Sequence, residues 1–125
     1  MRTNMKIKTS ELTGNALDWA VAECLGHSFV FGDTEYTPDG KLYARGGSVE
    51  RHYSTDWGQG GPIIEREKID IENTHWEPKV FYAKLLGDEP YGSSRTEGPT
   101  LLIAAMRCYV ASKLGDEVEV PDELV

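Results

Sequence analysis

The sequence lacks any run of about 18 apolar residues, the length that a membrane-spanning helix needs. It also lacks the apolar segment near the N-terminus that is typical of a secretion signal. Basic residues are few, because 13 Lys and Arg stand against 21 Asp and Glu, giving a formal net charge of −8. A general DNA- or RNA-binding surface needs clustered Lys and Arg to neutralise phosphates. We therefore expect a cytoplasmic protein that binds neither membranes nor nucleic acid directly.

Cysteine and histidine are scarce as well. Cys24 and Cys108 both fall in apolar helical patterns, which predicts two buried free thiols rather than a disulfide. The three histidines, His27, His52 and His75, do not have the spacing of metal ligands. The sequence therefore predicts no metal site and no cofactor.

What remains is an ordinary globular composition. Its 125 residues are 39% hydrophobic and 27% charged, which is typical of one domain with one core, so we expect residues 1–125 to form a single domain. Residues 1–8 are predicted to be flexible or an edge strand. Residues 116–125 hold five acidic residues and no basic one. We expect an acidic, solvated tail there, or alternatively a docking segment for a basic partner surface.

Two stretches show helical patterns near the two ends of the chain. From Ser10 to Leu25, apolar residues recur at three- and four-residue spacing, and Gly26 is suited to end the helix. Residues 101–114 are almost continuously apolar, which is typical of a buried helix. Within this last helix, Arg107 and Lys113 are expected to mark the solvent side.

Between these helices, short β-branched, aromatic or alternating runs predict strands at residues 28–31, 41–45, 69–72 and 80–85. Residues 32–52 are otherwise polar and predict a long surface excursion, and the Pro/Gly/Ser-rich residues 87–98 predict a loop. With a further helix in the middle of the chain, the pattern predicts an α/β (α+β) fold. We expect a small layered sandwich with about three helices packed on a short, mostly antiparallel or mixed sheet.

The middle helix follows a polar turn. Ser54, Thr55 and Asp56 each carry a side-chain oxygen that can cap a first helical turn. We expect this turn, at residues 55–57, to run into a helix that ends at Lys68. Pro62 falls too deep for the first turn, so an irregularity is expected there.

The same turn is the candidate binding site. Residues 56–61, Asp-Trp-Gly-Gln-Gly-Gly, resemble a glycine-rich anion cradle ahead of a helix but lack the Gly-Lys-Ser/Thr ending of a P-loop. Structural capping and close backbone packing is the alternative explanation. Trp57 and Trp76 either pack in the core or line an aromatic patch for a partner, with Arg95 and Arg107 supplying charge. The candidate ligand- or partner-binding residues are Tyr53, Ser54, Thr55, Asp56, Trp57, Gly60 and Gly61.

The longest distinctive segments are Lys6 to Gly14, Ala16 to Ala22, Tyr53-Ser-Thr-Asp-Trp, Gly61-Pro-Ile-Ile-Glu, and Gly98-Pro-Thr followed by Leu102 to Lys113. These segments resemble the NinX-like family of tailed bacteriophages and prophages. The central segment and the last helix also resemble the phage α/β/α-sandwich domain. The resemblance implies a phage-encoded accessory protein made in the host cytoplasm, and it implies no catalytic residues.

Three functional hypotheses follow from these observations. The first is a non-enzymatic module that binds a host or phage protein through the central turn, with a homodimer also possible. The second is a small-ligand or nucleotide-handling enzyme at residues 56–61, with His52 and Asp56 as an acid–base pair. The third is an acidic nucleic-acid mimic in which residues 116–125 occupy a basic groove of another protein.

Overall fold

The computed structural model describes residues 4–25, 34–36, 42–44, 51–73, 81–85 and 95–125. Within them lie three α-helices, two 3-10 turns and seven strands. The predictions for the strand at 28–31 and for Gly26, His27, His75 and Trp76 fall outside the described residues. The α-helices are α1 (Gly14–Cys24), α3 (Trp57–Glu67) and α4 (Leu101–Leu114).

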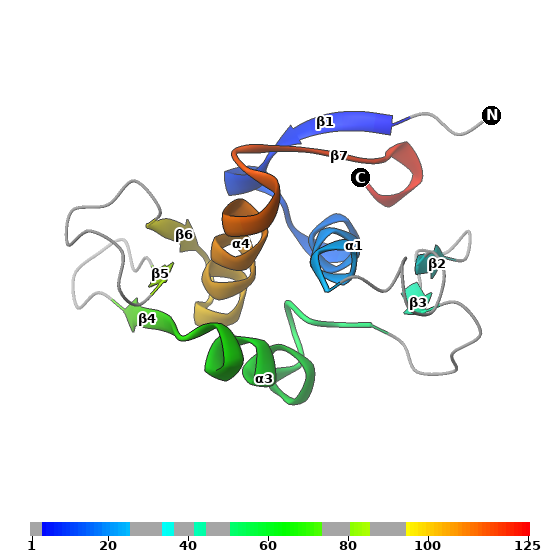
Figure 1. The fold of residues 1–125 in the computed structure, drawn as a ribbon. Helices are drawn as coiled ribbons and strands as arrows, with labels where there is room; N and C mark the ends of the chain where they lie inside the picture. Colours follow the sequence, from blue (N-terminus) through cyan, green and yellow to red (C-terminus); the bar gives the residue numbers. More distant parts are fainter. Residues whose placement is uncertain (1–3, 26–33, 37–41, 45–50, 74–80, 86–94) are drawn as a thin grey trace.

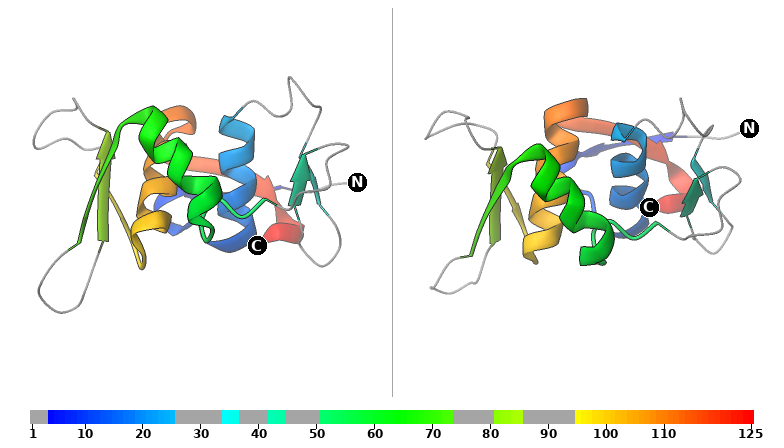
Figure 2. Two further views of the ribbon diagram at one scale, coloured as in Figure 1. Left: turned by 90° about the horizontal axis from the view of Figure 1, so that it is seen from below. Right: turned by 60° about the horizontal axis from the view of Figure 1, so that its bottom comes forward.

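Helix α4 lies at the centre of the fold (Figure 1). Every residue from Ala104 to Val110 is buried, because elements pack against the helix from several sides. The sheet of β4 (Ile69–Asn73), β5 (Phe81–Leu85) and β6 (Thr96–Gly98) covers one side, and α1 and α3 cover others (Figure 2). Thr100 caps α4 by accepting a 3.0 Å bond from the Ile103 amide, and Gly115 ends it at φ 86°. The predicted bounds and burial of this helix are confirmed.

The strands form three separate antiparallel sheets among the described residues rather than one. Strand β1 (Asn4–Lys8) pairs with β7 (Glu117–Pro121), and β2 (Thr34–Tyr36) pairs with β3 (Leu42–Ala44). The third sheet has the order β4 (Ile69–Asn73), β5 (Phe81–Leu85) and β6 (Thr96–Gly98). The α+β class with three helices and small antiparallel sheets is thereby confirmed, as are the predicted strands at 41–45, 69–72 and 80–85.

Two short strands lie where the sequence predicted irregular chain. Strand β2 falls inside the expected excursion of residues 32–52, and β6 falls at the end of the expected loop of residues 87–98. Strand β6 needs its terminal glycine, because a Cβ on Gly98 would lie 2.7 Å from the Ala104 amide nitrogen. The loop-like composition of this segment therefore reflects a strand that touches the α4 backbone.

The last ten residues are not a solvated tail. Glu117–Pro121 form β7, in which Val118 and Val120 are buried while Glu117 and Glu119 are exposed. This alternation of buried and exposed residues is the period of a half-buried strand. Leu124 is also buried, in the 3-10 turn η2 (Asp122–Leu124). The number of acidic residues in this segment gave no sign of its apolar face, which belongs to the core. Residues 4–8, predicted as flexible or an edge strand, form β1 on the outer side.

Within the predicted helical segment of residues 10–25, helix α1 has Thr13 at its N-cap position, although the Thr13 side chain makes no capping bond. Residues Thr9–Glu11 form the 3-10 turn η1, Leu12 and Thr13 are extended, and the α-helix starts at Gly14. Leu12 lies in the core in spite of standing before the helix, so its apolar character does not extend the helical period. Trp19 and Cys24 are half-buried against the core, as a flanking packing role requires.

Helix α3 begins at Trp57 and contains Pro62 at its sixth position. Because proline has no N–H, the bond that position 62 would donate to the Gly58 carbonyl is missing. The helix ends at Lys68, whose φ of 56° places it in the left-handed region. The predicted capped turn and the helix end at Lys68 therefore match the observed element, and Pro62 lies inside one continuous helix.

Candidate functional site

The central turn, defined as residues 53–61, is anchored from inside the protein. The Ser54 amide donates a 2.8 Å hydrogen bond to the Asp18 carboxylate of α1, and both residues are buried. Burial raises the pKa of the Asp18 carboxyl above its usual range, although hydrogen bonding from Ser54 and the nearby His52 act in the opposite direction. Tyr53 is buried beside this pair. Ser54 thus anchors the turn to α1, and both Tyr53 and Ser54 lie in the protein interior.

Gly60 and the backbone of the turn are in close contact. A Cβ on Gly60 would collide with the Tyr53 carbonyl oxygen and would lie 2.6 Å from Leu102 Cδ1 of α4. Gly61 has more room, since its nearest neighbour to a Cβ is Trp57 Cε3 at 4.0 Å. The glycine at position 60 therefore allows the first turn of α3 to approach α4. The capping-and-packing interpretation of this turn accounts for Gly60.

The exposed part of the turn is Thr55, Asp56, Trp57 and Gly58. Asp56 caps α3, because its Oδ1 accepts a 2.8 Å bond from the Gly58 amide. Trp57 is the first residue of the helix and is 51% exposed, so the default expectation that it packs in the core is wrong. The buried residues of α3 are Gly60 and Ile63 instead.

The arrangement is unfavourable for an anion cradle. The Asp56 carboxylate accepts the hydrogen bond of the Gly58 amide, so that amide is not available to a phosphate. The carboxylate also adds a negative charge there, which repels an anion. His52 meets Asp56 through the main chain, since the His52 carbonyl accepts the Asp56 amide at 2.8 Å. The His52 amide donates to Gln59 Oε1 at 2.7 Å. These hydrogen bonds join His52 to Asp56 and Gln59 and so close the turn on itself.

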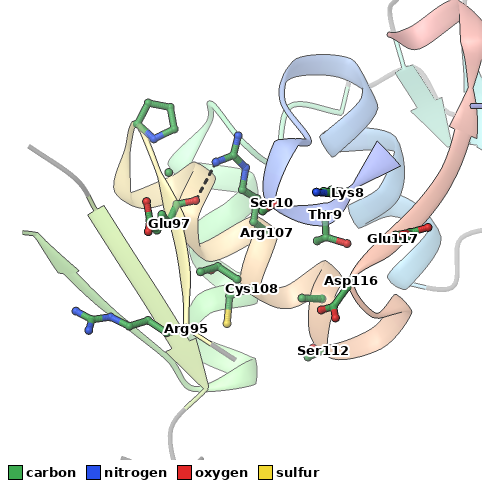
Figure 3. A pocket seen from close by; sticks show the side chains of 14 residues that line it. Lys8, Thr9, Ser10, Arg95, Glu97, Arg107, Cys108, Ser112, Asp116 and Glu117 are labelled. Atoms are coloured by element: carbon green, nitrogen blue, oxygen red, sulfur yellow. Dashed lines mark hydrogen bonds between the residues drawn. The ribbon is translucent and has the colours of Figure 1, made fainter. Parts of the chain in front are cut away.

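A groove lies along α4, away from the central turn, and we call it the α4 groove. Its volume is about 990 Å³. One wall carries Arg95 and Glu97 near β6, and the opposite wall carries Lys8 and Thr9 (Figure 3). Residues of α4 lie between the walls, and its other lining residues include Ser10, Gly98, Pro99, Cys108, Ala111, Ser112, Asp116 and Glu117.

Arg107 connects the two walls of the α4 groove. It is only 7% exposed, so the expectation that it marks the solvent side of α4 is wrong. Its Nε donates to the Leu12 carbonyl and its Nη1 donates to the Glu97 carbonyl, both at 2.8 Å. Burial lowers the pKa of Arg107, while the nearby Glu97 charge acts in the opposite direction. Nor does Arg95 lie at the central turn, because it contacts Glu72 and the Tyr82 ring instead.

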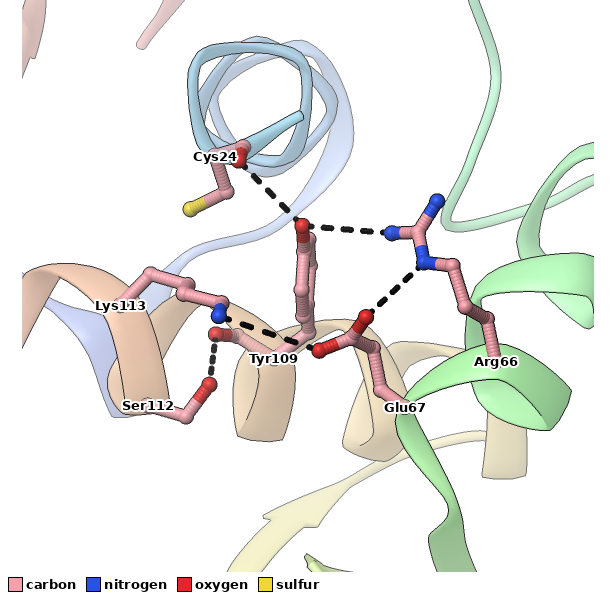
Figure 4. A network of polar contacts seen from close by, with 6 residues as sticks. All are labelled: Cys24, Arg66, Glu67, Tyr109, Ser112 and Lys113. Carbon is pink, nitrogen blue, oxygen red and sulfur yellow. Dashed lines mark hydrogen bonds and ion pairs between the residues drawn. The ribbon is translucent and has the colours of Figure 1, made fainter. Parts of the chain in front are cut away.

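A polar network joins the C-terminal ends of the three helices (Figure 4). The Tyr109 hydroxyl donates to the Cys24 carbonyl at 3.3 Å and accepts from Arg66 Nη2 at 3.5 Å. Arg66 also bonds Glu67 at 2.9 Å, and Glu67 lies 3.9 Å from Lys113 Nζ. Both cysteines are free thiols, as predicted, and burial raises the pKa of Cys24 to about 12. The network fastens the helices together and leaves Cys24 a poor nucleophile.

Among the residues that the structure describes, no group of three or more His, Cys, Asp or Glu side chains could hold a metal ion. No helix formed by those residues is long and apolar enough to cross a membrane.

Comparison with known families decides the relationship that the sequence segments suggested. The sequence model described as bacteriophage P22 NinX matches residues 8–113, which is most of the chain. The chain belongs to the NinX family. No curated protein matches this chain. The matched range includes the whole central turn and Arg107, so both features lie in the part of the chain that defines its membership.

Sequence reasoning missed two buried charged residues in the described part of this NinX-family chain. Asp18 was hidden inside the apolar period of α1, where a single acid among Ala16, Leu17 and Ala20 was the available signal. Arg107 gave a similar signal, since it stands alone among the apolar residues of α4. A lone charge inside an otherwise buried helix predicts a fixed polar contact more often than a solvated face.

Acidic residues of β7 lie opposite basic residues of β1 in this antiparallel pair. Lys6 lies opposite Glu119, and Lys8 lies opposite Glu117. Lys6 Nζ is also 3.9 Å from a Glu117 carboxylate oxygen. Opposite charges directly across an antiparallel pair attract one another. This register reduces the negative field on which the nucleic-acid mimic hypothesis depended.

Proposed function

We propose that this NinX-family chain is a phage accessory protein that acts in the host cytoplasm as a non-enzymatic, protein-binding module. The observation that carries the proposal is the position of Trp57. Its side chain is 51% exposed, while Ser54 and Gly60 of the same turn are held against the protein interior. Tryptophan is one of the residues that most often dominate protein interfaces. A tryptophan on a rigid support loses little conformational freedom when a partner covers it.

The support under Trp57 consists of contacts described above. Asp56 fixes the start of α3, Gly60 holds the helix against Leu102, and Ser54 ties the turn to Asp18. Thr55 and Asp56 are exposed beside the ring and offer polar groups at its edge. An interface of this kind has an aromatic anchor with a polar rim. The proposed contact surface is therefore Thr55–Trp57, a smaller set than the seven residues predicted from sequence.

The enzyme hypothesis has less support in this geometry. An acid–base pair needs side chains that reach a common substrate atom. The Asp56 carboxylate instead bonds the Gly58 amide, and the resolved contacts between His52 and Asp56 run through the main chain. A hydrolase or nucleotide-binding site at residues 56–61 is therefore not the function that we propose.

The test is affinity capture of the tagged protein from phage-infected cells, with nuclease treatment and mass spectrometry. We expect one host or phage protein at a constant ratio to the tagged chain, and we expect Trp57→Ala to remove it. The matched control is Met5→Ala, because Met5 is also an exposed apolar side chain, at 46%, but lies on β1. Capture that survives Trp57→Ala would contradict the proposed surface.

The variant must be shown to fold. Because Trp57 is half exposed, Trp57→Ala is expected to change the free energy of unfolding by no more than about 0.5 kcal/mol. Urea unfolding of both variants checks this value. Sedimentation at several concentrations checks whether the partner is a second copy of the chain, which would appear as a dimer that Trp57→Ala dissociates.

A further inference from the structure

The buried guanidinium of Arg107 has no acidic partner. Its two hydrogen bonds go to the Leu12 and Glu97 carbonyls, which are neutral groups and take two of its five N–H donors. Among the described residues no carboxylate lies within ion-pair distance of it. The Glu97 charge acts on Arg107 from beyond ion-pair distance, so the hydration that burial removes from the guanidinium is only partly offset. The two carbonyls also hold the guanidinium in one orientation.

The other charges around the α4 groove are mostly engaged or balanced. Arg95 pairs with Glu72 at 3.7 Å, and Glu117 pairs with Lys6 at 3.9 Å. Lys8 and Arg107 then remain as cations of the lining, with Glu97 and Asp116 as acids. A polyphosphate or a nucleic-acid backbone would meet these acids at close range. A ligand with one negative charge on a longer polar body avoids that repulsion.

We propose that the α4 groove binds a ligand through a single carboxylate, which pairs with the remaining N–H donors of Arg107. A planar carboxylate suits a guanidinium because two parallel hydrogen bonds can form, and charge-assisted bonds of this kind are stronger than neutral ones. The groove volume of about 990 Å³ holds far more than the carboxylate group itself. The carboxylate belongs either to the end of a peptide chain or to a free organic acid. This site is separate from Trp57 and does not depend on the proposed function.

The test is an NMR titration of the full-length, isotope-labelled protein with four probes. They are acetate, butyrate, an N-acetylated tripeptide with a free C-terminal carboxylate, and the same tripeptide ending in an amide. We expect saturable shifts of the Arg107 Nε–H and of the Thr9 and Glu97 amides with the free acids only. Tighter binding of the tripeptide identifies a peptide chain as the source, and equal binding of butyrate identifies a small organic acid.

Two variants separate recognition from a structural role of Arg107. Glu97→Gln keeps the backbone carbonyl that Arg107 bonds but removes the competing negative charge, so the free acids should bind several-fold tighter. Arg107→Lys retains the charge and loses the planar pair of donors, so binding should fall by about tenfold or more. Absence of saturable shifts, equal binding of the amide, or unchanged affinity in Glu97→Gln would each overturn the proposal. Glu97→Gln keeps the test decisive should Arg107→Lys unfold.

Discussion

Asp18 and Ser54, 36 residues apart in the chain, are joined by a 2.8 Å hydrogen bond in which the Ser54 amide donates to the Asp18 carboxylate. The bond connects α1 to the start of the central turn. Because Asp18 is only 3% exposed, its negative charge is held largely out of water. The position of the turn, and with it the position of Trp57, therefore depends on a charged residue in the core.

Asp18 should make the stability of the protein depend on pH. Burial raises the pKa of this carboxyl, so the folded state binds its proton more tightly than the unfolded state does. The free energy of unfolding should therefore fall as pH rises from the ordinary range of an aspartate through the raised pKa, and then level off. Asp18→Asn should remove that fall while keeping an oxygen for the Ser54 amide.

Urea unfolding at a series of pH values measures this effect. The control is Asp56→Asn, because Asp56 is an exposed cap and asparagine caps a helix about as well. The control should keep the wild-type pH profile. An Asp18→Asn profile with the same fall as the wild type would mean that another group is responsible.

Gly60 should tolerate no side chain. Gly60→Ala places a Cβ against the Tyr53 carbonyl oxygen and 2.6 Å from Leu102 Cδ1, and the backbone oxygen cannot rotate away. We expect a loss of about 2–3 kcal/mol in the free energy of unfolding. Gly61→Ala is the matched control, with 4.0 Å to its nearest neighbour, and should gain about 1 kcal/mol from the higher helix propensity of alanine. Equal effects of the two substitutions in chemical denaturation would contradict the packing.

Val120 should stabilise the folded protein, because its side chain lies in the hydrophobic core. It is fully buried in β7, and Val120→Ala should lower the free energy of unfolding by about 2 kcal/mol. The neighbouring Glu119→Ala removes an exposed side chain opposite Lys6 and should cost no more than about 0.5 kcal/mol. Urea midpoints of the two variants give the comparison. A negligible loss for Val120→Ala would show that β7 adds little to the core.

Cys24 should resist alkylation and disulfide exchange in the folded protein. The thiolate is the reactive form, and with a pKa of about 12 almost none is present at neutral pH. A Cys108→Ala variant with Ellman's reagent isolates the Cys24 reaction. We expect labelling to be slower than that of a free cysteine by orders of magnitude and to become fast in guanidinium. Rapid labelling without denaturant would mean that the Tyr109 network opens readily.

Local signals predicted the regular elements well. The α4 bounds followed from a long apolar run closed by Gly115, and β4 and β5 followed from alternation. What local signals could not show was which residues are brought together by the fold. The acid-rich β7 was misjudged because charge was counted without the valines between the acids. Arg107 was placed in solvent because a long cationic side chain is usually exposed, and its two carbonyl acceptors come from distant segments.

For the candidate site too, local features could be predicted from the sequence, and contacts between distant segments could not. Asp56 as a helix cap was a local property and was predicted together with the helix that it starts. The exposure of Trp57 and the burial of Tyr53 depend on which face of α3 meets α4, and no pattern within residues 53–61 fixes that face. The α4 groove was not predicted, because its lining comes from four parts of the chain that meet only in the folded protein.

The pairing of β1 with β7 has a consequence for synthesis on the ribosome. Asn4 is paired with Pro121, so β1 cannot pair until β7 has been made. A contact of such long sequence separation closes a large loop and forms late. Until β7 emerges, the apolar surface that Val118 and Val120 later cover stays open. The sheet of β1 and β7 therefore forms only after β7 has left the exit tunnel.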